Sequence, residues 1–320
     1  LLGGHGGTPR ATTVARVTST TRKAPAPPRG VIAPLTGVRD PTSGAAHRPA
    51  LTVKIENTPM ARPQIGLDRA DVVYEEVVEG GITRLLAIFQ SQVPAVVGPV
   101  RSVRRTDQGV VTPIGGLFVY SGGAAYAIAS IRSAPVTLVD ETRAGPAMFR
   151  DSSRQAPHNL FGRPAALFAI GGAPVPPPPL FTYRTPSQPV PGLPVTQAGV
   201  GFGAGYAVAY AWDAVHRAWD RSIFGHPDLV ASGVQEAPRN VIVMFVQYSG
   251  GVGVIGAEAQ LIGSGDAVVL TGGHRITGRW VRPDRARPAQ FFDSTGAPVR
   301  LNPGQTWVEL APIGTPVTSS

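Results

Sequence analysis

The feature that most restricts the fold is a proline-rich stretch, GGAPVPPPPLFTYRTPSQPVPGLP at residues 171–194. Proline lacks an amide hydrogen and has a fixed φ angle, so such a run adopts extended or polyproline conformations and excludes a helix or a central strand. A chain of 320 residues, 42% of them hydrophobic, is long enough for more than one compact domain. We therefore predict an N-terminal domain over residues 34–172, a proline-rich linker over 173–198 and a smaller C-terminal domain over 199–316.

The first 33 residues are rich in Thr, Ala, Pro, Gly and Arg and show no periodic apolar pattern. Such a segment buries too little surface to offset the entropy cost of ordering it, so we expect a flexible tether over residues 1–33. The tether carries five of the nine excess positive charges, whereas residues 186–320 are neutral overall. Because no nucleic-acid-binding motif occurs, we expect no nucleic acid partner, and the basic tether suits an acidic surface such as anionic lipid or a wall polymer.

Several classes of chemistry are excluded by what the sequence lacks. It has no cysteine, so disulfides, thiolate catalysis and cysteine-ligated zinc are ruled out. It also has no H-E-x-x-H motif, no P-loop and no dinucleotide-binding glycine fingerprint. We therefore expect no metal and no cofactor.

The apolar patterns predict an α+β fold, with a mixed α/β N-terminal domain followed by a smaller β-rich C-terminal domain. Alternating or β-branched runs predict strands, and glycine after a short apolar run predicts the end of a helix. The expected strands cover residues 50–57, 70–79, 82–91, 117–123 and 240–250, with a hairpin near Ala214, and helices are expected from Ser102 onward and over 163–171. A helix over 70–79 remains an alternative, because its apolar residues also fit helical spacing.

The stretch VEGGITRLL, residues 78–86, places charged side chains inside an apolar hairpin. A two-residue turn at Gly80-Gly81 would put Glu75, Glu79 and Arg84 on one face, within reach of one another. One interpretation is a structural ion-pair set that joins the sheet to a neighbouring element. The other is the wall of a polar pocket in which Arg84 offers its planar guanidinium to a carboxylate or phosphate.

A second charged cluster, VGPVRSVRRTD at residues 97–107, surrounds an expected helix start. Arg101, Ser102, Arg104 and Asp107 could bind an anion there, or the arginines could simply pair with Asp107 along a solvated helix. The loop SRQAPHNLFGR adds His158 and Asn159 as weaker candidates.

Across nearly the whole chain after the tether, the sequence resembles the YerB-like lipoproteins, a bacterial two-domain family of unknown function. The resemblance is carried by PLTGV at 34–38, NTPMARPQIGLDRADVVYEEVVEGGITRLLAIFQS at 57–91, VGPVRSVRRTD at 97–107, NVIVMFVQYSG at 240–250, GRWVRP at 278–283 and LNPGQTWVEL at 301–310. It implies an exported, extracytoplasmic protein held by an N-terminal lipid anchor that would precede Leu1. No activity comes with the family. The polar residues that match its motifs are Asn57, Arg62, Gln64, Glu79, Thr83, Arg84, Arg101, Ser102, Arg104 and Asp107.

The leading functional hypothesis is a cell-envelope binding protein that holds an anionic component, such as a peptidoglycan or glycan fragment, in an arginine-lined pocket. The ligand-binding candidates are Asn57, Arg62, Gln64, Glu79, Arg84, Arg101, Ser102, Arg104, Asp107 and Asn159. An envelope hydrolase or transferase is an alternative, with Glu79 or Asp107 as general base and His158 as a further catalytic candidate. A third alternative is a protein-interaction scaffold that has no site for a small ligand.

Overall fold

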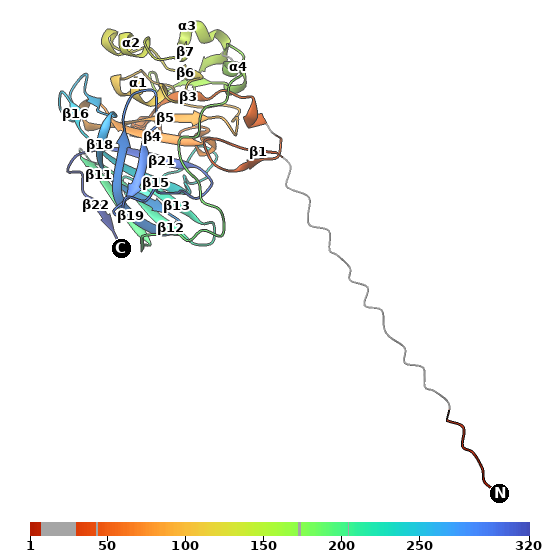
Figure 1. Cartoon of the computed structure of the whole chain (residues 1–320). Coiled ribbons are helices and arrows are strands. Elements are labelled where there is room, and N and C mark those ends of the chain that lie inside the picture. Colours follow the sequence, from red (N-terminus) through yellow and green to blue (C-terminus); the bar gives the residue numbers. More distant parts are fainter. Residues whose placement is uncertain (8–29, 43, 172–173, 204) are drawn as a thin grey trace.

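The computed structural model describes residues 1–7, 30–42, 44–171, 174–203 and 205–320 (Figure 1). Most of the predicted tether, residues 8–29, and the first linker position lie outside the described residues.

The central element is one mixed sheet that contains strands from both halves of the chain. Its order is β10-β19-β18-β15-β21-β4-β5-β3-β6-β7, with β20 paired to β19. The strands are β3 (Leu51–Glu56), β4 (Val72–Val77), β5 (Thr83–Phe89), β6 (Leu117–Val119), β7 (Thr137–Val139), β10 (Leu193–Pro194), β15 (Asn240–Val246), β18 (Gly263–Thr271), β19 (His274–Arg282), β20 (Gln290–Asp293) and β21 (Thr306–Pro312). The strands predicted over 50–57, 70–79, 82–91 and 240–250 are therefore confirmed, and the helical alternative for 70–79 is wrong.

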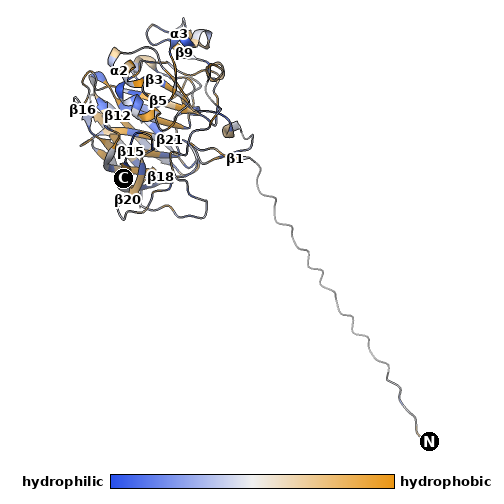
Figure 2. Cartoon of the chain, turned by 45° about the horizontal axis from the view of Figure 1, so that its top comes forward, coloured by the Kyte–Doolittle hydropathy of each residue, from blue (hydrophilic) through white to orange (hydrophobic). Residues whose placement is uncertain are grey.

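The strand β21 joins the two halves of the sheet. It lies between β15 and β4 and is parallel to both, with Glu309 opposite Val243 on one side and Glu75 on the other. Its residues are all buried, as expected for a parallel strand covered on both faces. The apolar character of the central strands is visible in Figure 2, where β5 is largely orange.

The described α-helices all belong to the N-terminal part and cover both faces of the sheet (Figure 1). On one face, α1 (Arg105–Val111) and α2 (Ala125–Ile131) pack Val111 and Ile131 into a cluster with Leu86 and Phe118. The other face packs against α3 (Glu141–Ala144), α4 (Pro164–Phe168) and the hairpin of β8 (Met148–Arg150) and β9 (Leu160–Gly162).

A second, five-stranded antiparallel sheet belongs to the C-terminal part. Its order is β14-β13-β12-β11-β22. The strands are β11 (Gln197–Gly203), β12 (Tyr206–Asp213), β13 (Ala218–Ile223), β14 (His226–Pro227) and β22 (Val317–Ser319). The turn between β12 and β13 contains Ala214, as predicted. The fold is therefore α+β, with a mixed N-terminal domain and a β-rich C-terminal domain.

The remaining elements are short. Two further strand pairs are β1 (Val31–Ile32) with β2 (Arg39–Asp40), and β16 (Tyr248–Ser249) with β17 (Glu258–Ala259). Five 3₁₀ turns cover Gly44–Ala46, Pro59–Ala61, Leu67–Arg69, Glu79–Gly81 and Gly145–Ala147. Residues 174–192 of the proline-rich stretch form no helix or strand.

Candidate anion-binding site

Charged side chains gather where the parallel strands β3 and β4 end and the antiparallel strand β5 begins. Glu56 and Glu76 stand at the carboxyl ends of β3 and β4, and Arg84 lies near the start of β5. The strand register pairs Arg84 with both of these glutamates, so the three side chains share one face of the sheet. An edge of this kind, outside the carboxyl ends of parallel strands, is where open α/β sheets commonly bind ligands.

The hairpin between β4 and β5 differs from the prediction by one residue. Glu76, rather than Val77, lies opposite Arg84. The amide of Val78 donates to the carbonyl of Ile82 at 2.8 Å, and the loop that this bond closes includes Glu79 as well as the two glycines. Because a shift of one residue turns every side chain to the other face, the prediction that Glu75 shares a face with Arg84 is wrong.

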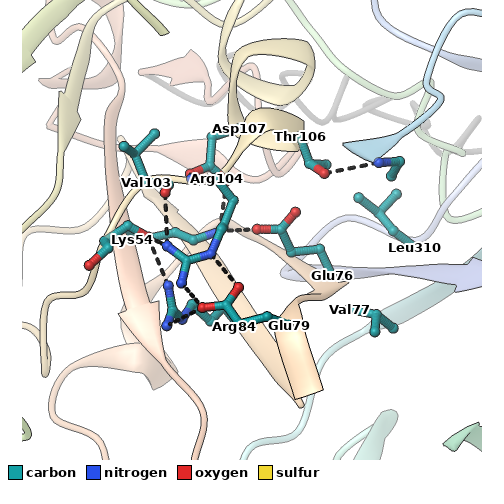
Figure 3. A network of polar contacts seen from close by, with 12 residues as sticks. Lys54, Glu76, Val77, Glu79, Arg84, Val103, Arg104, Thr106, Asp107 and Leu310 are labelled. Carbon is teal, nitrogen blue, oxygen red and sulfur yellow. Dashed lines mark hydrogen bonds and ion pairs between the residues drawn. The ribbon is translucent and has the colours of Figure 1, made fainter. Parts of the chain in front are cut away.

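Glu79 nevertheless reaches the arginines from this turn (Figure 3). Arg104 donates from Nε to Oε2 of Glu79 at 2.7 Å and from Nη2 to Oε1, and Arg84 approaches the same Oε1 at 3.4 Å. Partial burial acts to raise the pKa of Glu79, but the hydrogen bond and positive charge of Arg104, aided by Arg84, outweigh it and lower this pKa to about 2. The side chain of Glu79 is 35% exposed, so this ion-pair cluster opens to solvent.

The three arginines of the sequence hypothesis lie together. Arg84 and Arg104 both donate to the carbonyl oxygen of Ser102, at 3.2 and 3.3 Å. Burial and the positive charges of Arg104 and Arg101 lower the pKa of Arg84 to about 10, although the negative charge of Glu79 acts in the opposite direction. This direction reflects crowding of positive charge around Arg84.

Behind the arginines lies a fully buried triad of Lys54, Glu76 and Asp107. Nζ of Lys54 donates to Oδ1 of Asp107 at 2.7 Å and to a carboxylate oxygen of Glu76. Burial raises the pKa of Asp107 to about 7, although the charge of Lys54 acts in the opposite direction. Asp107 is therefore shielded from any ligand at the surface.

Asp107 also fixes the start of α1. Its Oδ2 accepts the amide N–H of Arg104 at 2.7 Å, and the helix begins at Arg105. The helix expected from Ser102 onward therefore begins three residues later, where the carboxylate of Asp107 binds the N-cap amide of Arg104.

A third group surrounds Glu56. Nε of Arg101 lies 3.2 Å from Oε2 of Glu56, and Nδ1 of His158 lies 3.0 and 2.9 Å from its two oxygens. Glu56 is buried, whereas Arg101 and His158 are 21% and 19% exposed. Next to His158, Asn159 accepts a hydrogen bond from Nη1 of Arg150 at 3.0 Å.

Ser121 and His158 are held by different carboxylates and form no hydrogen bond with each other in the described structure. The hydroxyl of Ser121 donates to Glu141 at 2.7 Å, while His158 is bound to Glu56.

Asn57, Arg62 and Gln64 lie on the opposite face, away from the arginine cluster. The side-chain amide of Asn57 donates from Nδ2 to Glu75 at 3.0 Å and to Thr83 at 2.7 Å. Its Oδ1 accepts from Gln64 at 3.1 Å and from Arg62. These residues belong to a network at the boundary between the two domains.

On the C-terminal side, this boundary network continues with Arg221 and Asp228. The sequence analysis did not predict either residue as part of a site. Arg221 is fully buried and forms ion pairs with Glu75 and with Asp228, which also binds Arg62. One signal was present in the sequence: Arg221 lies between Trp219 and Ile223 on the inward face of an alternating strand, where a charge requires a buried partner.

Comparisons with known proteins show which family the chain belongs to. The model described as "Protein of unknown function (DUF3048) N-terminal domain" matches residues 35–172, and the model of the C-terminal domain of the same family matches residues 198–308. The chain therefore belongs to this two-domain family of unknown function, which is the YerB-like family.

Two matches show how the chain relates to a protein of Bacillus subtilis. A 130-residue segment is 38% identical to "Putative lipoprotein YerB" of strain 168, covering 40% of this chain and 39% of that relative. The crystal structure of YerB from Bacillus subtilis superposes with a TM-score of 0.78 at 25% identity, covering 90% of this chain and 99% of that one.

Two searches of the described residues found nothing. None of the helices there has the length and hydropathy to cross a membrane. Nor do three or more His, Asp or Glu side chains gather in the described ranges in a way that could hold a metal ion.

Proposed function

We propose that this protein is an extracytoplasmic, membrane-anchored binding protein that holds an anionic envelope component, such as a peptidoglycan or glycan fragment. The site is the carboxyl edge of β3 and β4, where Arg84, Arg101 and Arg104 meet. The lipoprotein name of its Bacillus subtilis relative supports the location. The observation that carries the proposed activity is the difference in exposure between the cations and anions of this edge.

Two of the three arginines reach the surface, and the acidic groups of this edge other than Glu79 do not. Arg101 and Arg104 are 21% and 14% exposed, whereas Glu56 is buried and paired with Arg101. Buried Glu56 holds the guanidinium of Arg101, while Glu79 and the carbonyls of Ser102 and Val103 hold that of Arg104. Guanidinium groups fixed in this way suit planar, bidentate recognition of carboxylate or phosphate.

Glu79 supplies the second part of the argument. Its carboxylate is the one partly exposed anion of the cluster, and it already accepts from Arg104 in the bidentate arrangement that a ligand carboxylate would use. Glu79 lies on a turn rather than in a strand, so it can be displaced without disturbing the sheet. A ligand anion would exchange with Glu79 on the two arginines.

The hydrolase or transferase alternative has less physical support. A carboxylate whose pKa is lowered to about 2 is a poor proton acceptor near neutral pH, which disfavours Glu79 as general base. Asp107 has a pKa raised to about 7 but is completely buried behind Lys54, so no substrate proton can reach it in this conformation.

Isothermal titration of the chain with muropeptides and wall-glycan fragments tests the proposal. We expect one ligand class to bind, and we expect Arg104→Gln to raise its Kd at least tenfold, a loss of about 1.4 kcal/mol. Glu79→Gln removes the competing internal anion and should leave affinity unchanged or increase it.

The matched control is Arg287→Gln, which removes one positive charge from an exposed ion pair with Asp284. If Arg287→Gln weakens binding as much as Arg104→Gln, the effect is general electrostatics and the proposed site is wrong. Absence of binding by every fragment would leave the arginine cluster as a structural ion-pair set.

A further inference from the structure

A second basic hollow lies where the proline-rich stretch meets the C-terminal domain. Its volume is about 300 Å³, and the residues that line it are Arg184, Thr185, Pro186, Gln188, Val190, Arg217, Arg239, Asn302 and Pro303. Three of these are arginines, and the described lining contains no acidic residue. The hollow is built from residues outside the arginine cluster of the N-terminal domain.

Arg184 is the most unusual of the three arginines. Its backbone N–H donates to the carbonyl of Leu301 at 2.9 Å, and its Nη2 donates to the carbonyl of Arg300. Only 6% of the residue is exposed, yet its buried Nε and Nη1 have no hydrogen-bond partner among the described residues. Nor does any described carboxylate form an ion pair with it.

A buried guanidinium without a counterion is costly. Burial lowers the pKa of Arg184, and no neighbouring acid offsets this effect. Native proteins pair or hydrogen-bond nearly all such groups, so an exception requires an explanation. Nε–H and Nη1–H lie on different edges of the planar guanidinium, so a bound anion would accept from one of them, and it would also provide the missing charge.

The other two arginines are held at the same hollow. Nη1 of Arg239 donates to the carbonyl of His216 and, at 2.8 Å, to that of Arg217. The other nitrogens of this guanidinium remain for other partners. Gly304 makes room for the Arg239 side chain, because a Cβ on this glycine would lie 2.1 Å from its Cγ. The nearby carboxylate of Asp213 is already paired with His216.

We propose that this hollow binds the phosphate group of a small phosphomonoester. Three positive charges without an acid match a divalent phosphate better than a singly charged carboxylate, and guanidinium groups bind phosphate oxygens in a bidentate manner. Pro186, Val190 and Pro303 provide apolar contacts for the organic part of the ligand. The site is independent of the one assigned under the proposed function.

Titration calorimetry of the chain with inorganic phosphate, glycerol 3-phosphate and acetate, at fixed ionic strength, tests the inference. Glycerol 3-phosphate should bind, and Arg184→Met should weaken it at least tenfold, because the Met side chain fills the space without any N–H donor. The same variant should be at least as thermostable as the wild type without ligand, since it removes a buried unpaired charge.

If Arg184→Met does not fold, Arg217→Gln replaces it, because Arg217 is exposed and its side chain makes no hydrogen bond or ion pair within the described chain. That variant should weaken glycerol 3-phosphate binding several-fold, and Arg287→Gln should not. The assignment is overturned if glycerol 3-phosphate does not bind the wild type, or if it binds Arg184→Met or Arg217→Gln with wild-type affinity. It is also overturned if acetate binds as tightly as glycerol 3-phosphate.

Discussion

Two buried carboxylates at the domain boundary should respond very differently to the same substitution. Glu75 and Glu309 lie directly opposite each other on the parallel strands β4 and β21, and both are fully buried. Glu75 accepts from Nη2 of Arg221 at 2.5 Å and from Asn57 at 3.0 Å. Glu309 accepts only from the hydroxyl of Tyr210, and its Oε2 has no partner in the described chain.

The charges of these two residues follow from their partners. Burial, followed by the negative charge of Glu75, raises the pKa of Glu309 well above its usual range. We therefore expect Glu309 to keep its proton to a higher pH than an ordinary glutamate, while Glu75 forms the ion pair with Arg221.

The expected magnitudes differ accordingly. Glu75→Gln removes one partner of a buried ion pair, so it should lower the free energy of unfolding by about 3–5 kcal/mol. Glu309→Gln preserves the size of the side chain and an acceptor for Tyr210, and it replaces a neutral acid with a neutral amide. It should therefore cost less than about 1 kcal/mol near pH 5.

The pH dependence gives the sharper contrast. Above the ordinary glutamate pKa the unfolded chain releases the proton of Glu309 while the folded chain retains it, so the folded state binds more protons. Stability then falls as pH rises, by up to about 1.4 kcal/mol per pH unit for this one group, until the pH reaches the raised pKa of the folded state. Glu309→Gln lacks this loss, so its stability relative to the wild type should rise between roughly pH 5.5 and 7.5.

Urea denaturation at these two pH values, followed by tryptophan fluorescence, measures the difference. Trp307 reports on the boundary directly, because the guanidinium carbon of Arg221 lies 4.2 Å from its ring centroid. If Glu309→Gln destabilises the protein at both pH values as much as Glu75→Gln, then Glu309 is ionised in the folded state and the reasoning fails.

Two further predictions concern other buried charges. Burial raises the pKa of Asp71 to about 6, so wild-type stability should fall by about 3 kcal/mol as pH rises from about 4 to 6, and Asp71→Asn should abolish this dependence in the same denaturation assay. Lys54→Met leaves Glu76 and Asp107 without their shared cation, and it should destabilise the fold by about 3–5 kcal/mol and speed amide exchange at the start of α1.

The sequence predicted local structure well because local patterns determine it. The strands around Val53, Val73 and Ile88 have the β-branched composition expected of them. The helices α1 and α4 lie within the two segments expected to be helical, whereas α2 and α3 were not predicted. The arginine cluster was also predictable, since Arg84 lies only three residues beyond the turn and Arg101 and Arg104 lie in one short segment.

The sequence did not predict which residues face each other across the sheet. The register of the β4–β5 hairpin depended on whether Glu79 belongs to the turn, and a difference of one residue moved Glu75 from one face to the other. The pairing of β21 with β4 joins residues more than 200 positions apart, and no local pattern encodes such a contact. Arg221 could not be matched to Glu75 for the same reason.

The shared sheet restricts how ligand binding can act on this protein. Glu75 and Glu76 are adjacent on β4 but face opposite ways, so the strand that supports the arginine cluster is also fastened to the C-terminal domain through Arg221. A hinge motion between the domains would have to break the β21–β4 ladder and this buried ion pair together. The turn Glu79–Gly81 lies outside the sheet ladder, and the amide of Gly80 donates to the carbonyl of Gly253 at 2.9 Å. Ligand exchange at the arginines should therefore move this turn and the Gly253 loop, and leave the two domains as one rigid body.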